Sequence, residues 1–382
     1  MKFSFVYKSL FLIGLFLTQA AFSQNDKHFP SFSWDKVPVA FHFGKKGTLL
    51  TRKEAKFVAS HSNFVVLEKA HGFPKYKYSE EAIAADAAVL KDLNPDMKIV
   101  FYWNAFLDYS MYKAHEEYQE HPEWWLKTKE GELDLKSDRI KRYDLSNKKL
   151  RKWWVGVAKQ NLKNKNIDGI FFDALNQVTN PRNKKLWGDE KYNAIQQGLI
   201  KLIEETRCKI GDDKLIVYNG IRSTPKRNTG NNFPDNTDAV MIEHFGYFNS
   251  RTKESMLKDI QEMEKAGKTG KIVVFKTWPE NAWLNKNFIK KSKKEKKKIS
   301  KEHINFALAS FLAGAQKHSY LIYNWGYRLK MGSLLWYPEL DKPLGKPLNE
   351  MQVNGWILTR NYEHASIWVD LENKKSKIDW KK

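Results

Sequence analysis

Cysteine is almost absent from this sequence of 382 residues, because Cys208 is the only one. A single thiol excludes an internal disulfide and provides too few thiolates for a structural zinc site or an iron–sulfur cluster. The ten histidines are scattered, and no two of them form an HxxxH or HExxH pair, which argues against a dedicated catalytic zinc ion. We therefore expect a protein with no metal and no organic cofactor.

Hydrophobic runs of the length that spans a bilayer, about 18 residues or more, are also missing. The apolar run at residues 10–17 follows Lys2 and Lys8 and precedes small residues that end at Ser23. This pattern is typical of a secretory signal peptide. We expect residues 1–23 to be removed, and the mature protein to be secreted or periplasmic with no membrane partner.

Acidic residues are too few to balance the basic ones, since 44 Asp and Glu face 66 Lys and Arg and the net charge is +22. Such an excess predicts an anionic partner, and an acidic polysaccharide is favoured over nucleic acid because no nucleic-acid-binding motif is present. The densest basic run, residues 290–301, is expected to be a solvated loop on the rim of the site. Single cations near strand ends would suit sulfate or carboxylate groups. They are Arg142, Arg182, Arg222 and Lys276.

Short apolar runs alternate with helical segments along the chain. The eight expected strands are residues 37–44, 64–69, 98–105, 167–174, 214–220, 238–244, 270–278 and 319–327. Their nearly continuous hydrophobicity indicates parallel strands covered by helices, and eight of them favour a (β/α)8 TIM barrel of the α/β class over a doubly wound sheet. We assign residues 24–350 to the barrel. Residues 351–382 are expected to form a C-terminal β-hairpin extension packed on it.

Polar and aromatic side chains gather where the expected strands end. The carboxyl ends of barrel strands carry the active site in this fold, so these residues are candidates for function. The candidates are His42, Glu68, Trp103, Asn104, Asp173, Asn219, Glu243, His244, Lys276, Trp278, Asn324 and Trp325.

Two carboxylates stand out among the strand ends, because Asp173 and Glu243 each follow four apolar or small residues. Glycoside hydrolysis uses such a pair, one as nucleophile or base and one as acid. We expect the two carboxyl groups to lie about 5 to 5.5 Å apart, as in retaining enzymes, and the pKa of Glu243 to be raised by Asp173. The alternative is structural: Asp173 caps the following loop and Glu243 pairs with Lys276. For Glu68 we expect substrate binding.

Tryptophan in the loops after the strands is typical of a carbohydrate cleft, because flat rings stack on sugar faces. Seven tryptophans fall at strand ends or in these loops, whereas Trp153 and Trp154 fit a buried helix face. The seven are Trp103, Trp124, Trp125, Trp278, Trp283, Trp325 and Trp336.

Three short motifs give the chain a family resemblance. They are DGIFFD at residues 168–173, YDLSN at residues 143–147 and LGKP at residues 344–347. With the basic charge, they resemble secreted (β/α)8 glycoside hydrolases, most of all glycoside hydrolase family 168, the retaining endo-α-1,3-fucanases that act on sulfated fucan. The resemblance implies that Asp173 is the nucleophile and Glu243 the acid/base, and Asp144 of the second motif joins the expected substrate-binding residues.

Together these features predict a secreted, monomeric, retaining endo-glycosidase that cleaves an anionic polysaccharide such as sulfated fucan. Two alternatives remain at this stage. One is a non-catalytic polyanion-binding protein on a degenerate barrel, which needs the basic rim but not a facing carboxylate pair. The other is a hydrolase of a neutral glycan, whose lysines serve only solubility.

Overall fold

The computed structural model describes residues 28–221, 236–280 and 282–381. The expected signal peptide and Arg222 lie outside the described residues. Within those residues, no helix combines the length and the apolar character that crossing a membrane requires.

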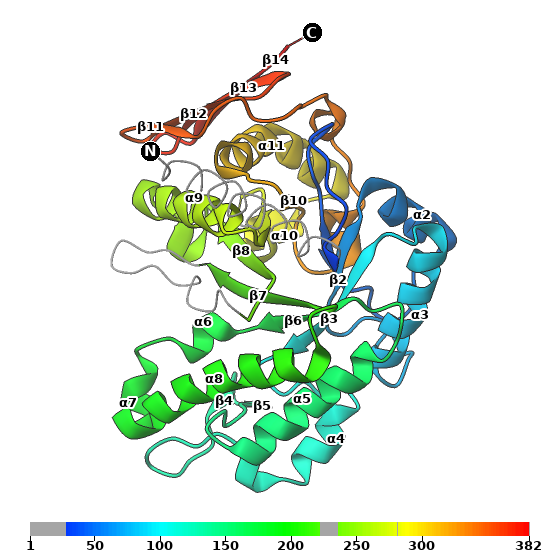
Figure 1. Ribbon diagram of the computed structural model, residues 1–382, viewed down its shortest axis with the longest axis vertical. Coiled ribbons are helices and arrows are strands. Elements are labelled where there is room, and N and C mark those ends of the chain that lie inside the picture. Colours follow the sequence, from blue (N-terminus) through cyan, green and yellow to red (C-terminus); the bar gives the residue numbers. More distant parts are fainter. Residues whose placement is uncertain (1–27, 222–235, 281, 382) are drawn as a thin grey trace, which may run out of the picture.

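Eight parallel strands follow one another around the centre of the molecule (Figure 1). They are β1 (Phe41–Phe43), β2 (Phe64–Leu67), β3 (Lys98–Asn104), β6 (Gly169–Asp173), β7 (Leu215–Ile221), β8 (Ala239–Phe245), β9 (Ile272–Thr277) and β10 (Ser319–Tyr323). The last strand returns to the first, because the Leu321 amide donates to the Pro38 carbonyl at 2.9 Å and the Ala40 amide donates to the Leu321 carbonyl at 3.0 Å. The predicted (β/α)8 barrel is confirmed.

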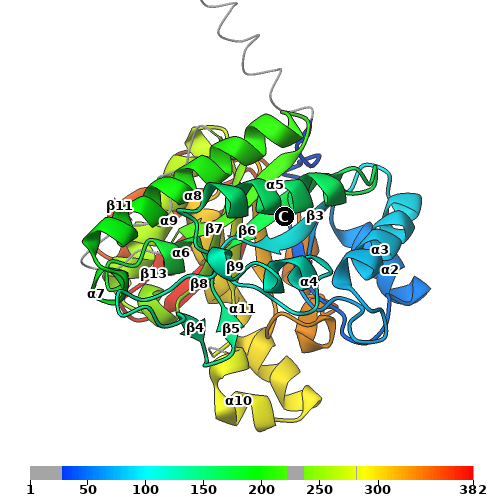
Figure 2. The same ribbon diagram turned by 90° about the horizontal axis from the view of Figure 1, so that it is seen from below.

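Helices cover the outside of the strands, as both ribbon views show (Figure 1, Figure 2). The longer ones are α2 (Arg52–His61), α3 (Ser79–Leu93), α5 (Lys148–Leu162), α8 (Asp189–Ile210), α9 (Lys253–Lys268) and α11 (Lys293–Gly314). The shorter ones are α4 (Ala114–Gln119), α6 (Leu175–Val178), α7 (Asn183–Trp187) and α10 (Lys286–Lys290).

The basic run at residues 290–301 is helical, not the loop expected from its charge. It ends α10 and forms the first turns of α11, which begins after Ser292. The Ser292 hydroxyl accepts from the Glu295 amide, and the Glu295 carboxylate accepts from the Ser292 amide. This capping box satisfies two of the amides that a helix start leaves unpaired, and it fixes several lysines on one rigid helix end.

A long excursion separates β3 from β6. It contains α4 and a small antiparallel hairpin of β4 (Leu135–Lys136) and β5 (Ile140–Lys141), which the sequence did not lead us to expect. The Asp108 amide donates to the Lys141 carbonyl at 3.0 Å and the Tyr143 amide to the Phe106 carbonyl at 2.9 Å. These bonds hold the hairpin beside the loop that follows β3.

The C-terminal residues form a four-stranded antiparallel sheet that lies over α11 (Figure 1). Its strands are β11 (Gln352–Asn354), β12 (Ile357–Asn361), β13 (Ala365–Asp370) and β14 (Lys375–Trp380). The predicted hairpin is present as β12 and β13, and β11 and β14 extend it on both sides. The sheet is tied to α11 because the Tyr362 hydroxyl donates to the Leu312 carbonyl at 2.6 Å and Arg360 donates to the Ala315 carbonyl.

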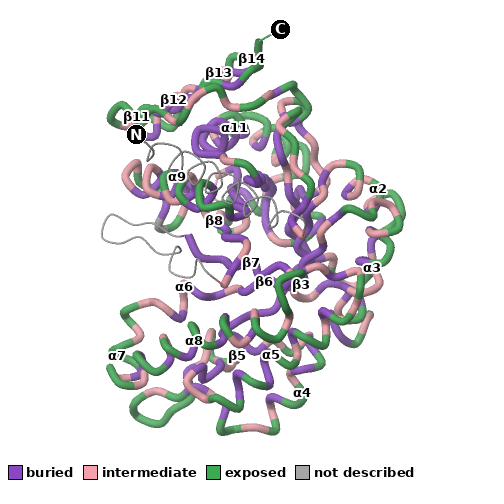
Figure 3. The backbone as a smooth tube through the Cα atoms, in the orientation of Figure 1, coloured by how far each residue is buried: buried purple, intermediate pink, exposed green. Residues whose placement is uncertain are grey.

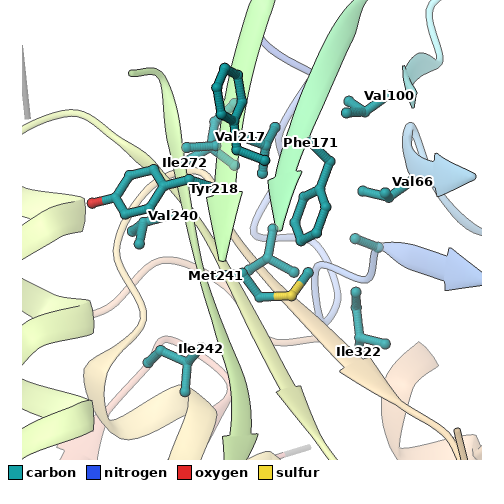
Figure 4. Packing of buried hydrophobic residues seen from close by; sticks show 14 of the residues in the cluster. Val66, Val100, Phe171, Val217, Tyr218, Val240, Met241, Ile242, Ile272 and Ile322 are labelled. Carbon is teal, nitrogen blue, oxygen red and sulfur yellow. The ribbon is translucent and has the colours of Figure 1, made fainter. Parts of the chain in front are cut away.

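The central strands consist largely of buried residues (Figure 3). Because side chains alternate between the two faces of a strand, they point in turn toward the barrel interior and toward the surrounding helices. Figure 4 shows Phe171 and Met241 inside the ring of strands, whereas Tyr218 is directed outward. The ring of Phe171 lies 5.8 Å from that of Tyr102 and 5.2 Å from that of His42. Apolar rings therefore fill the barrel below its mouth.

Candidate active site

Along the strands, polar residues follow apolar ones two positions later on the same face. Because side chains alternate with a period of two, a polar residue that ends a strand stands above an apolar residue of the barrel interior. The pairs that matter here are Val66 and Glu68, Phe171 and Asp173, Val217 and Asn219, and Met241 and Glu243. Three carboxylates and an amide are thus placed at one end of the barrel.

The carboxylate of Asp173 is held by four hydrogen-bond donors. One oxygen accepts from the Tyr102 hydroxyl at 2.5 Å and from Asn104 Nδ2 at 3.3 Å. The other accepts from Asn219 Nδ2 at 3.1 Å and from the Ala174 amide at 2.7 Å. Ala174 has a φ of 73°, a left-handed conformation that costs a non-glycine residue of order 1 kcal/mol or more. This backbone conformation lets the Ala174 amide donate to Asp173. Together the four donors fix the carboxylate in one orientation.

Asn219 joins the two carboxylates that the sequence singled out. Its Nδ2 lies 3.1 Å from Asp173 Oδ1 and 2.6 Å from Glu243 Oε2. The two oxygens can be no farther apart than these distances added together, which is less than the roughly 6.5 to 9.5 Å between the carboxyl groups of inverting glycosidases. This upper limit favours the closer spacing of about 5 to 5.5 Å that retaining enzymes have.

Basic side chains surround Glu243. His244 Nε2 lies 3.2 Å from Glu243 Oε2. Burial by itself raises the pKa of Glu243, but His244, Lys276 and His42 outweigh burial and hold this pKa well below its ordinary value. The raised pKa expected from the sequence is therefore wrong, because it counted Asp173 as a neighbour and not these basic groups.

Glu68 is the centre of a second buried charge cluster. Its carboxylate lies 2.9 Å from His42 Nε2 and 2.9 Å from Lys69 Nζ. Burial acts to raise the pKa of Glu68, but Lys69 and His42 lower it to about 2. His42 Nδ1 lies 3.1 Å from Lys276 Nζ, and since an ammonium only donates, Nδ1 accepts and the ring proton sits on Nε2, facing Glu68.

Lys276 is buried between this cluster and two aromatic rings. Its Nζ lies 4.2 Å from the ring centre of Tyr327 and 4.7 Å from that of Trp278. Burial lowers the pKa of Lys276 to about 8, although Glu243 and Glu68 act to raise it. The side chain thus carries a positive charge at neutral pH and loses it in mildly alkaline solution.

We expect Lys276→Met to move the alkaline limb of the pH–activity profile to higher pH. The substitution removes one of the charges that lower the pKa of Glu243, and a general acid is lost as the pH rises through its pKa. The measurement is kcat/KM between about pH 4 and 9. Lys271→Met, at the opposite end of the same strand, should leave the limb in place. An unshifted limb in Lys276→Met would contradict a link between these two residues.

Aromatic rings form one side of the site. The ring of Trp278 lies 5.9 Å from His244 and 5.4 Å from Tyr327, and Trp283 lies 5.2 Å from Tyr327. Trp278 therefore adjoins the carboxylates, as do His42, Glu68, Asn104, Asn219, His244 and Lys276 from the predicted set.

Four residues of the site were missed from the sequence. Tyr102 binds Asp173, and its signal was available, because it precedes Asn104 by two positions on the same face of β3. Tyr109 and Tyr327 come from loops, where alternation gives no signal. Lys136 belongs to the unexpected β4–β5 hairpin: burial lowers its pKa, while Asp173 and Glu243 raise it, so it lies within electrostatic reach of both carboxylates.

Trp103 and Asp144 are not part of this cluster, contrary to prediction. Trp103 has the opposite parity to Tyr102, and its ring packs 5.9 Å from Trp154 of α5, outside the barrel. Asp144 lies in the turn before α5, where it accepts from the Ser146 amide at 3.2 Å and pairs with Lys191 at 2.5 Å. Both side chains stabilise the packing of α5.

Asn324 and Trp325 also lie apart from the carboxylates. The Asn324 side chain accepts from the Gly326 amide at 3.3 Å and donates to Ser333 at 3.4 Å, so it orders the loop after β10. The Trp325 indole donates to the Ser300 hydroxyl at 2.5 Å, and its ring lines a different cavity. Both side chains thus stabilise the region around the loop after β10.

The side chains of this site are not arranged as metal ligands in the part of the chain that the structure describes. Among residues 28–221, 236–280 and 282–381, no group of three or more His, Cys, Asp or Glu side chains is arranged to hold a metal ion. Lysines and a histidine occupy the positions beside Glu68 and Glu243 that a cation would take.

Known proteins resemble this chain in sequence and in fold. The family model described as "Hypothetical glycosyl hydrolase family 15" matches residues 91–366. Alpha-L-fucosidase isoenzyme 2 from Paenibacillus thiaminolyticus is similar in structure, with 12% identity and a TM-score of 0.51 over 79% of this chain and 48% of that one. An alpha-amylase from Geobacillus thermoleovorans has 11% identity and a TM-score of 0.50 over 88% and 87% of the two chains. At such low identity these structures show the fold alone, and the chain spans about half the length of the fucosidase. No curated protein matches the sequence.

Proposed function

Since the chain belongs to the family described as hypothetical glycosyl hydrolase family 15, we propose that it is a secreted, retaining endo-glycoside hydrolase of an anionic polysaccharide. Family and barrel support glycosidase activity. The net charge of +22 favours a sulfated polymer, and sulfated fucan is the substrate we select. The observation that carries the proposal is the single amide of Asn219 that binds both Asp173 and Glu243.

In the first step, an Asp173 oxygen attacks the anomeric carbon and forms a covalent glycosyl-enzyme. The glycosidic carbon–oxygen bond breaks, and Glu243 transfers its proton to the departing oxygen. In the second step, Glu243 takes a proton from a water molecule whose oxygen attacks the same carbon. The bond to Asp173 then breaks, and the sugar leaves with its original anomeric configuration. Each proton that Glu243 gives away is thus returned.

The low pKa of Glu243 fits the second step, which needs its carboxylate as a base. The first step needs a proton on Glu243. Sulfate groups of a bound substrate would offset the positive charge of Lys276 and Lys136, and with less positive charge nearby the pKa of Glu243 rises. Binding of an anionic substrate thus favours the protonated form of Glu243 that the first step needs.

We expect sulfated fucan to be cleaved with a kcat/KM at least about tenfold above that of its chemically desulfated form, and its KM to rise strongly between about 0.05 and 0.5 M NaCl. Salt screens the ion pairs between basic side chains and sulfates and opposes counterion release. Reducing-end release measures both quantities. Desulfated fucan serves as the control, because the KM of a neutral chain should not depend on salt.

Two outcomes would separate the alternatives. Equal cleavage of sulfated and desulfated chains without salt dependence would remove the anionic substrate and leave a hydrolase of a neutral glycan. Tight, salt-sensitive binding with no reducing ends from any polymer would instead favour a non-catalytic polyanion-binding protein.

A further inference from the structure

A cavity of about 450 Å³ opens next to the loops that follow β1 and β10. Its walls come from both ends of the barrel sequence, namely the loop after β1, the loop after β10, and the first residue of α11. Apolar side chains line part of it: Trp325, Leu329, Leu334 and Leu335. Charged side chains line the rest: Lys45, Lys46, Lys293, Arg328 and Lys330, with Glu54 as the one carboxylate. We call this cavity the basic pocket.

The basic pocket shares a wall with the catalytic cluster at Gly44. A Cβ at this position would meet Glu68 Cβ at 3.3 Å and the Lys69 carbonyl at 3.0 Å, so the pocket lining lies directly against the Glu68 strand end. The Gly44 amide donates to the Tyr327 carbonyl at 2.8 Å, and Arg328 follows Tyr327 into the pocket lining. A polymer lying across the barrel mouth therefore passes from the carboxylates to the pocket.

The pocket is electrostatically unbalanced. Lys45, which also lines it, is neutralised because its Nζ lies 2.6 Å from Glu54 and 2.7 Å from the Leu49 carbonyl. Across the part of the chain that the structure describes, the other four cations have no carboxylate within ion-pair distance. Four unpaired positive charges around one cavity repel each other, and an anion placed among them relieves that repulsion.

We infer that the basic pocket is a subsite for an anionic substituent of the substrate, a sulfate or carboxylate group on a sugar near the cleaved bond. The inference rests on the proposed function in taking a saccharide as the ligand. The apolar wall suits the C–H face of a sugar ring, and the planar guanidinium of Arg328 can bind two oxygens of one anionic group. The volume lies in the range of small-molecule sites.

A pair of triple variants tests the inference. The pocket triple is Lys46→Gln, Arg328→Gln and Lys330→Gln. The control triple is Lys294→Gln, Lys297→Gln and Lys298→Gln, which removes the same charge from exposed positions of α11 outside the pocket lining. All six side chains are exposed, so neither triple should unfold the protein.

Binding is measured by titration calorimetry in an Asp173→Asn background with sulfated fucan, desulfated fucan and polygalacturonate. We expect the pocket triple to bind its preferred anionic polymer at least about tenfold more weakly at low salt, and the control triple less than about threefold more weakly. Sulfated fucan and polygalacturonate identify the substituent as sulfate or carboxylate. A further variant carries Lys46→Arg and Lys330→Arg in place of the glutamines at these two positions of the pocket triple. Because it restores two positive charges, it should recover binding.

Equal losses in the two triples would overturn the subsite, because binding would then follow total charge. The result is separable from the proposed function through hydrolysis by the unaltered protein. If the unaltered protein cleaves a polymer but the two triple variants lose binding equally, the subsite is refuted and the proposed hydrolase is not. Loss of binding in the pocket triple, with no cleavage of any polymer by the unaltered protein, supports the subsite and refutes the hydrolase.

Discussion

Asp173→Asn should lower the turnover of sulfated polysaccharide by about a thousandfold or more. The amide has nearly the same shape as the carboxylate, but it cannot form the covalent bond to the anomeric carbon. Tyr102, Asn104 and Asn219, which hold the native side chain, remain in place, so the binding surface is preserved. Reducing-end release under saturating substrate measures the loss.

Asp144→Asn provides the matched control. It makes the same chemical change at a carboxylate that the structure places in the turn before α5, and its turnover should stay within about threefold of the unaltered protein. If Asp173→Asn kept more than about a tenth of the activity, Asp173 would not be the nucleophile.

Glu243→Ala should reduce cleavage of the polysaccharide by about a hundredfold or more, because the departing sugar oxygen then leaves without a proton. An aryl glycoside with a good leaving group needs no such proton, and it should be affected much less at the first step. Added azide should then accelerate the second step, because it attacks the glycosyl-enzyme without a general base.

The product of that rescue identifies the mechanism. A glycosyl azide with the anomeric configuration of the substrate would agree with two displacements at one carbon. Failure of azide to rescue any glycoside, in a variant that remains folded by circular dichroism, would mean that another residue acts as the acid/base.

The barrel could be predicted because its signal is regular. Parallel strands that are buried on both faces appear as apolar runs in the sequence. Because helices connect these strands, the polar carboxyl ends of the strands all lie at the same end of the barrel. That Asp173 and Glu243 lie close together was predicted for the same reason, and the structure joins them through Asn219. The C-terminal hairpin was also found, but β11 and β14 were not, because their solvent-facing residues lack an apolar pattern.

The errors have two physical causes. One is the alternation of side chains along a strand: Trp103 is next to the last residue of β3, but it lies one position from Tyr102, so its ring faces α5 and not the mouth. The other is tertiary contact from loops. Lys136, from the inserted hairpin, interacts electrostatically with Asp173 and Glu243. The low pKa of Glu243 depends on His244, Lys276 and His42 together, and no local sequence pattern indicates that these groups meet.

The closing contact between β1 and β10 has a consequence for the order in which the protein matures. Leu321 pairs with backbone on both sides of Val39, and Gly44 pairs with Tyr327, so the Glu68 and Tyr327 sides of the cleft are joined by contacts nearly 300 residues apart in sequence. A nascent chain that has not yet delivered β10 has Asp173 and Glu243 but no closed mouth. Such distant pairing is slow to form. The cleft should therefore become complete only after the last strand of the barrel has been made and has paired with the first.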